Sequence, residues 1–314
     1  MSLSKTFADY FRCSNDWADF QAVGNGHSPA GFFRFGDAAI CYGRVGTGFY
    51  SPEPDAELYD ASADARIENG TCTIAFDPDT VVENLRRERY VPEALAAGRG
   101  PASGGLVRKA YYAVRPLLPV AVRKHLQRAS LKGWDKKPFP AWPVDRSVDS
   151  VFEQLMALAI RKQNAERVPF IWFWPEGKTG CAIMTHDVEQ RAGLNFCPAL
   201  MDLNDSHGIK SSFQVIPDGR YRATEAELDG IRNRGFEVNV HDWNHDGHLY
   251  DSREIFLERV AKINQVAEQY RAQGFRSGVL YRNTEWFGDL NFAYEMSIPN
   301  VGHLDPQPGG CCTV

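Results

Sequence analysis

Histidines gather in one short segment of the chain, in a pattern that suits metal binding. His241, His245 and His248 lie within a single run of the sequence, out of 8 histidines in all. If this segment turns helically, His241 and His245 at positions i and i+4 share one face. Two imidazoles on one face suit a single divalent metal ion. We therefore predict a metal site here, with His248 as a third ligand, a substrate contact or an exposed side chain.

Two acidic residues, Asp187 and Glu189, lie close together in the segment THDVE at 185–189. One carboxylate of such a pair can bind a cation while the other, held nearby, accepts a proton. Ordinary loop acids or a helix N-cap are the alternative interpretation. The pair is therefore a candidate for both metal binding and general base catalysis.

An arginine in the segment FRSG at 275–278 completes the set of chemically informative residues. Arg276 falls on a predicted strand, and an arginine in a buried sheet is costly unless a carboxylate pairs with it. Asp187 is the expected partner, which the guanidinium would hold ionised and oriented. The alternative is a strand arginine that faces the surface.

The elements that must position these residues alternate between strand and helix. Strands are predicted at 180–185, 211–216, 236–240 and 275–281, and helices at 198–204, 224–235 and 251–274. This alternation predicts a parallel sheet with crossover helices, open or closed into a barrel. The acidic pair and the histidine cluster then follow the carboxyl ends of strands, where sites assemble in such proteins.

The first part of the chain differs in character. Residues 1–100 contain short apolar runs bounded by Gly, Asp and Pro, which predict a small β-rich N-terminal lobe. Residues 101–145 are predicted to form a basic linker with short helices, and 146–314 a (β/α) domain that begins with a helix at 148–162. Between 101 and 140, nine Lys and Arg residues stand against one acid. This segment either makes a peripheral membrane contact or is a solvated linker.

Composition excludes several classes of protein. The 314 residues are 43% apolar and 24% charged, which is enough to bury a core, and the net charge of −5 gives no reason to expect a nucleic acid partner. No apolar stretch approaches the roughly 20 residues of a membrane span, and the sequence begins without a signal-peptide pattern. The 7 cysteines form no CxxC pair, which favours free thiols. We expect a cytoplasmic protein that can lie peripheral to the inner membrane face.

The order of the three motifs resembles that of the polysaccharide deacetylase family (NodB homology, carbohydrate esterase family 4). THDVE is similar to its first motif, HDWNH to its second and FRSG to its third. The resemblance covers about residues 175–314 and implies an α/β fold, a distorted (β/α) barrel of the NodB type. We expect the barrel to be incomplete, since the sequence ends before the family's fifth motif. Gly278 stands where the third motif has a proline, and residues 294–297 match the fourth motif loosely.

The resemblance also implies roles for individual residues. It assigns catalytic roles to Asp187, Arg276 and His303, and metal binding to Glu189, His241 and His245. Asp187 would be the base, oriented by Arg276, and His303 is the late candidate for protonating the leaving amine. Glu189 replaces the usual aspartate. The expected metal is Zn²⁺, and Co²⁺, Ni²⁺ or Mn²⁺ also suit these ligands.

The implied activity is that of a metal-dependent hydrolase of carbohydrate metabolism. It would remove N-acetyl groups from an N-acetylated sugar polymer, such as an exopolysaccharide, or from a lipid-linked glycan. The alternative is a non-catalytic carbohydrate-binding or scaffold protein with a degenerate or truncated deacetylase fold. A different metal-dependent amide or ester hydrolase is a third interpretation. A serine hydrolase is not favoured, because the sequence has no GxSxG motif.

Overall fold

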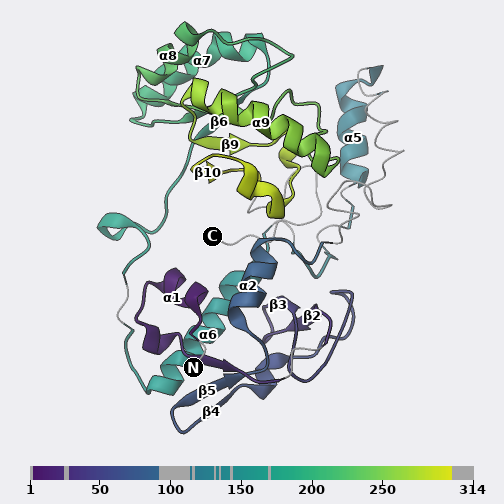
Figure 1. Ribbon diagram of the computed structural model, residues 1–314, viewed down its shortest axis with the longest axis vertical. Coiled ribbons are helices and arrows are strands. Elements are labelled where there is room, and N and C mark those ends of the chain that lie inside the picture. The colour runs from purple at the N-terminus through teal and green to yellow at the C-terminus, as the bar shows by residue number, and fades with distance from the viewer. Residues whose placement is uncertain are drawn as a thin grey trace. The chain divides into compact units, whose positions relative to one another are not determined.

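The computed structural model describes residues 3–24, 28–91, 114, 117–130, 132–133, 136–141, 144–168 and 171–298. These residues fall into two compact units, shown in Figure 1. Unit 1 contains the described residues up to 91 and from 114 to 179, and unit 2 those from 180 to 298. Each unit has its own apolar core.

Unit 1 combines two small sheets with helices. One sheet has the order β1 (Phe20–Ala22), β5 (Thr71–Ile74), β4 (Arg66–Glu68), with β1 parallel and β4 antiparallel to β5. The other is the antiparallel pair β2 (Gly31–Arg34) and β3 (Ile40–Gly43). The helices are α1 (Lys5–Phe11), α2 (Pro78–Arg86), α5 (Val120–Ser130) and α6 (Ser147–Gln163), with short 3₁₀ turns η1 (Asn15–Trp17), η2 (Ala61–Asp64) and η6 (Pro175–Gly177). Strands β2, β3 and β5 match the short apolar runs of the sequence.

Helix α6 belongs to unit 1, whereas the sequence predicted a boundary at residue 146 that places it in the C-terminal domain. Its buried side chains, Val148, Val151, Phe152 and Leu155, share one core with residues of α1 and the small sheets. The ring of Phe152 stacks on that of Tyr10 at a centroid distance of 4.3 Å. Because the apolar face of α6 is buried here, the units divide near residue 179. Helical periodicity predicts which face of a helix is apolar, but not which core buries it.

The described part of the basic segment contains α5. Its apolar residues Val120, Val122 and Leu126 are exposed, as is Leu117 just before it. Membrane contact through this segment stays a prediction. Among the described residues, no helix combines the length and the apolar character needed to cross a bilayer.

Unit 2 is built on a parallel five-stranded sheet, which confirms the predicted sheet type. The strands lie in chain order: β6 (Thr185–Val188), β7 (Ser212–Val215), β8 (Glu237–His241), β9 (Gly274–Arg276) and β10 (Tyr294–Glu295). Helices α7 (Arg191–Ser206), α8 (Glu225–Arg232) and α9 (Arg253–Tyr270) connect the first four strands, and 3₁₀ turns η7 (Gly278–Leu280) and η8 (Thr284–Asp289) precede the last. Within the described residues β6 and β10 are free edges, so the strands do not close into a barrel.

The two faces of this sheet differ in polarity. Residues that alternate along β6 to β9 pack with the helices in the core of unit 2: Val188, Phe213, Val215, Val238, Val240 and Phe275. Successive strand side chains point to opposite faces, so the intervening residues lie on the other face. These are polar, and include Asp187, Gln214, Asn239, His241 and Arg276. The polar face carries the chemically informative residues.

Several element bounds differ from the predictions. Strand β6 begins at Thr185 rather than at residue 180, because its ladder with β7 starts where Ser212 begins that strand. Helix α7 extends through Pro198 instead of starting there, since the residues it buries, Leu194 and Met201, lie on both sides of the proline. Helix α8 begins with a capping box between Thr224 and Glu227, in agreement with the helix predicted from residue 224.

Candidate metal centre

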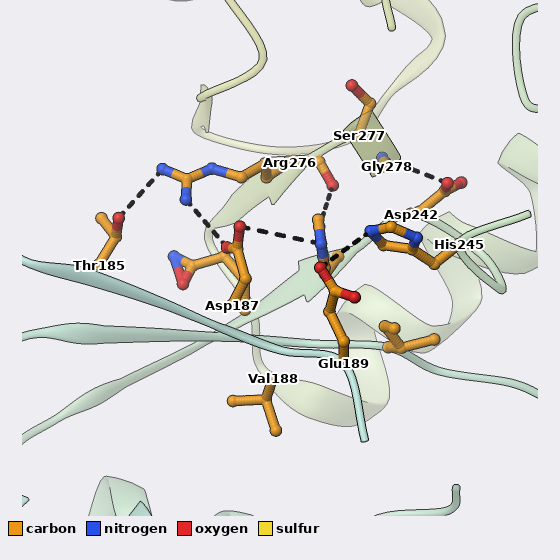
Figure 2. A network of polar contacts seen from close by, with 12 residues as sticks. Thr185, Asp187, Val188, Glu189, Asp242, His245, Arg276, Ser277 and Gly278 are labelled. Carbon is orange, nitrogen blue, oxygen red and sulfur yellow. Dashed lines mark hydrogen bonds and ion pairs between the residues drawn. The ribbon is translucent and has the colours of Figure 1, made fainter. Parts of the chain in front are cut away.

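Five of the six predicted site residues meet at the carboxyl edge of the parallel sheet. Asp187 lies in β6 and Glu189 directly after it, and His241 and Arg276 are the last residues of β8 and β9. Figure 2 shows Val188 pointing away from its two acidic neighbours, so Asp187 and Glu189 lie on the same side of the strand. His245 follows in the loop after β8. The sixth residue, His303, lies outside the described residues.

Glu189, His241 and His245 could hold a metal ion. One ligand atom from each lies within 4.8 Å of the others, as three side chains around a common point require. His241 is 2% exposed, and its Nε2 has no hydrogen-bond partner among the described residues. Its Nδ1 lies 3.0 Å from the carbonyl oxygen of Arg276, which accepts a hydrogen bond when Nδ1 carries the proton. That tautomer leaves the lone pair of Nε2 directed at the common point. An orphaned buried nitrogen beside an imidazole and a carboxylate fits a divalent ion.

The ionisation of these side chains is set by their contacts. The Glu189 carboxylate lies 3.3 Å from Nε2 of His245, and the hydrogen bond from His245 together with nearby positive charge lowers the pKa of Glu189 to about 2. Burial alone would lower the pKa of His245, but Glu189 raises it. Burial lowers the pKa of His241. Glu189 as an anion and His241 as a neutral imidazole are the forms that bind metals.

The two imidazoles come together without a helix, contrary to the expectation from their i and i+4 spacing. Asp242 and His245 have left-handed backbone conformations, with φ of 58° and 56°. The chain therefore folds back after β8 instead of continuing in a helical turn. The rings of His241 and His245 still pack edge to face, with centroids 4.8 Å apart and planes at 71°.

The expected ion pair between Asp187 and Arg276 is present. Nη1 of Arg276 donates to Oδ1 of Asp187 at 2.9 Å, and Nη2 donates to the Thr185 hydroxyl at 3.1 Å (Figure 2). The other carboxylate oxygen, Oδ2, lies 3.9 Å from Nε2 of His241. Arg276 thus holds one oxygen of Asp187 and leaves the other directed toward the candidate metal centre.

Asp242 supports the site in a way that the sequence did not reveal. Its side chain is 1% exposed, and Oδ2 accepts a hydrogen bond from the amide of Gly278 at 3.2 Å. Its own amide donates to the carbonyl oxygen of Arg276 at 2.8 Å. A Cβ at Gly278 would lie only 2.3 Å from Oδ2 of Asp242. Glycine at position 278, in place of the proline of the third motif, is therefore matched to the carboxylate of Asp242.

Arg220, in the loop after β7, is a second residue that sequence analysis missed. Nη1 donates to Oε2 of Glu189 at 3.1 Å, and Nη2 donates to the backbone oxygen of His245 at 3.2 Å. Nη2 also lies 3.4 Å from Nδ1 of His245. Its position after a strand, at the same edge as Glu189 and His245, was the signal that could have found it.

His248 does not join the cluster. Its Nδ1 pairs with Asp251 at 2.7 Å, and its side chain is 56% exposed. Its side chain is exposed, and a third histidine ligand is not observed among the described residues, whereas a role as a substrate contact stays a prediction.

No protein-family model matches this chain, and no curated protein does. Solved structures with a similar arrangement include a protein named as a polysaccharide deacetylase from Mycobacterium smegmatis (18% identity over 40% of this chain, TM-score 0.33). A chitin deacetylase from the fungus Colletotrichum lindemuthianum has 18% identity over 36% of this chain, with a TM-score of 0.30. A mutant of a pseudoenzyme of carbohydrate esterase family 4 has 19% identity over 43%, with a TM-score of 0.31.

The chain spans about half the length of these structures: 54% of each of the first two and 50% of the third. The roles proposed below follow from the geometry of the site.

Proposed function

We propose that this protein is a metal-dependent hydrolase that removes N-acetyl groups from an acetylamino-sugar polymer. The observation that carries the proposal is the convergence of Glu189, His241 and His245 within 4.8 Å, beside a carboxylate held by an arginine. The acetylated sugar as substrate is supported by the resemblance of the motifs THDVE, HDWNH and FRSG to those of the deacetylase family.

Asp187, Arg276 and His241 would have separate roles in the reaction. Asp187 would take the proton from the attacking water through Oδ2, the oxygen that Arg276 does not hold. Arg276 would fix the orientation of that carboxylate through the charge-assisted hydrogen bond from Nη1 to Oδ1. The carbonyl oxygen of Arg276 orients the ring of His241. The predicted role of His303, protonation of the leaving amine, remains a prediction.

Glu189, His241 and His245 would hold the metal ion, with zinc as the proposed ion and cobalt, nickel or manganese as alternatives. When bound, such an ion supplies Lewis acidity toward the acetyl carbonyl and lowers the pKa of water. The proposal therefore requires one divalent ion per chain.

Acetate release and metal content, measured on the same preparations, test this function. The substrates are short N-acetylglucosamine oligomers, and the variants are His241→Ala and His248→Ala. His241→Ala should lose both the metal and the activity, whereas His248→Ala, a histidine outside the cluster, should keep both. Equal acetate release from His241→Ala and the unmodified protein would reject the mechanism.

A non-catalytic carbohydrate-binding protein is the second candidate, and one observation favours it. Arg220 contacts one carboxylate oxygen of Glu189 and His245 contacts the other. The negative charge of Glu189 therefore has partners within the protein without a metal ion. Sugar binding without acetate release under each of the divalent metals would support this alternative over the hydrolase.

A further inference from the structure

Arg220 connects the candidate metal centre to a cavity beside it. The guanidinium uses Nη1 and Nη2 for its contacts with Glu189 and His245. Its Nε has no hydrogen-bond partner among the described residues, and its side chain is 38% exposed. An arginine has five N–H donors, so several remain for another molecule.

The cavity has a volume of about 570 Å³ and opens to solvent. It is lined by Gln190, Arg191, Ala192 and Arg220, which come from the loop after β6, the beginning of α7 and the loop after β7. It is a wide, shallow depression rather than an enclosed pocket, so a bound group would stay partly in contact with solvent. Arg220 lines the cavity and donates to the Glu189 carboxylate at 3.1 Å, so the cavity adjoins the carboxylate that would bind the metal.

The lining of this cavity carries positive charge and no acid. Arg191 donates through Nη1 to Glu227 at 2.6 Å and through Nη2 to the backbone oxygen of Arg222, and its side chain is 44% exposed. The acidic partners of the two arginines, Glu189 and Glu227, are not among the lining residues. A divalent ion on Glu189 would share that carboxylate's charge and leave the charge of Arg220 less compensated.

We propose that this cavity binds a negatively charged substituent of the sugar substrate, a carboxylate or a phosphate next to the acetamido group. Both groups accept paired hydrogen bonds from an arginine. Because Arg220 contacts Glu189 and His245, an anion bound to it lies beside the acetyl group that the metal centre would act on. This inference rests on the proposed function and narrows its substrate to acidic acetylamino sugars.

Binding measurements test the inference without relying on turnover. The protein is the full chain loaded with zinc and carrying Asp187→Asn, which removes the proposed base. The probes are N-acetylmuramic acid, N-acetylglucosamine 1-phosphate and neutral N-acetylglucosamine, titrated by calorimetry. The two acidic sugars carry their charge on the ring positions on either side of the acetamido carbon, a carboxylate at C3 and a phosphate at C1, so together they test both the kind and the position of the anion.

The variants are Arg220→Gln, Arg220→Lys and Arg191→Gln, with Arg222→Gln as the matched control on an exposed arginine outside the lining. Losing charge-assisted hydrogen bonds should weaken binding of the preferred acidic sugar about tenfold to a hundredfold. Binding of the neutral sugar should not change in Arg191→Gln or in Arg222→Gln, neither of which contacts a candidate metal ligand. Metal content is measured for each variant, because Arg220 contacts the candidate ligands Glu189 and His245. Arg191→Gln changes the lining of the cavity without a direct contact to these ligands.

Equal affinity for acidic and neutral sugars would overturn the inference, as would Arg191→Gln and Arg220→Gln variants that bind the acidic sugars normally. Acetate release from neutral oligomers without any preference for acidic ones would retain the proposed function and reject the anion site. Conversely, tight arginine-dependent binding of an acidic sugar, with no acetate release by the protein that keeps Asp187, would retain the anion site and reject the hydrolase.

Discussion

Replacing Gly278 by proline tests the coupling between Asp242 and the loop that follows β9. The backbone before this position tolerates a proline, because Ser277 is extended, with φ of −73° and ψ of 152°. The obstacle is the carboxylate of Asp242, which accepts the Gly278 amide hydrogen at 3.2 Å and lies 2.3 Å from where a Cβ would be. Proline has no amide hydrogen and adds ring atoms at that place.

The expected cost has two parts. A buried acceptor that loses its partner costs about 1–3 kcal/mol, and Asp242 is 1% exposed. Forcing extra atoms into a packed site costs typically about 1–3 kcal/mol more. We therefore expect Gly278→Pro to lower the free energy of unfolding of unit 2 by about 2–6 kcal/mol.

A second substitution separates this coupling from general damage. Asp242→Ser shortens the side chain and removes both the buried carboxylate and the steric conflict. The double variant Asp242→Ser/Gly278→Pro should be more stable than the sum of the single changes predicts, by about 2 kcal/mol. Gly288→Ala is the matched control, since a Cβ there meets nothing within 4 Å.

Hydrogen–deuterium exchange of β8 and α9 is the suitable assay, because it reports the opening of unit 2 separately from unit 1. A global unfolding curve would mix the two units. Strict additivity of Asp242→Ser and Gly278→Pro, or a Gly278→Pro variant as stable as the unmodified protein, would refute the coupling.

Three further predictions follow from the site and its surroundings. Asp187→Asn should lower acetate release about 10²- to 10⁴-fold with unchanged metal content, measured by elemental analysis; an unaffected rate would exclude it as the base. Chelation should abolish acetate release and zinc should restore it, while the far-ultraviolet circular dichroism stays constant, because His241 is oriented by the Arg276 carbonyl. Burial would raise the pKa of Asp246, but the ion pair with Arg259 lowers it from 3.8 to about 2. The ion pair therefore stabilises the folded state above about pH 4, and this stabilisation is lost as the pH falls through about 2. Arg259→Gln should therefore flatten the pH dependence of stability between these values, and an unchanged slope would contradict the assignment.

The parallel sheet and the meeting of the site residues were predictable for one physical reason. Strand and helix signals alternate, and the carboxyl ends of parallel strands lie at one edge whatever the details of the helices. Asp187, His241 and Arg276 are therefore brought together by topology alone. The pairing of Asp187 with Arg276, 89 positions apart, followed from the cost of an unpaired arginine in a sheet.

The conformation of the loop after β8 could not be predicted in the same way. The spacing of His241 and His245 is equally compatible with a helical turn and with a loop. The choice depends on Asp242 and His245 in left-handed conformations, which non-glycine residues adopt only with tertiary support. For Asp242 that support comes from the Gly278 amide, 36 positions away.

Alternating apolar and polar residues in a strand indicate which side chains share a face of the sheet. They do not indicate whether the polar face is exposed to solvent. The pattern of residues 211–216 is that of a strand with one face exposed to solvent. In the structure every residue of β7 is buried, and Gln214 is 0% exposed. Polar groups buried there bond to one another: Asn239 accepts from the Gly274 amide at 2.7 Å and donates to the Tyr294 hydroxyl at 2.8 Å. These bonds connect β8 to β9, the strand that carries Arg276, and to β10 on the other side of β9. A buried polar layer loses stability when it is only partly satisfied. The position of Arg276, and through it that of Asp187, therefore depends on hydrogen bonds beneath the site as much as on the apolar core behind it.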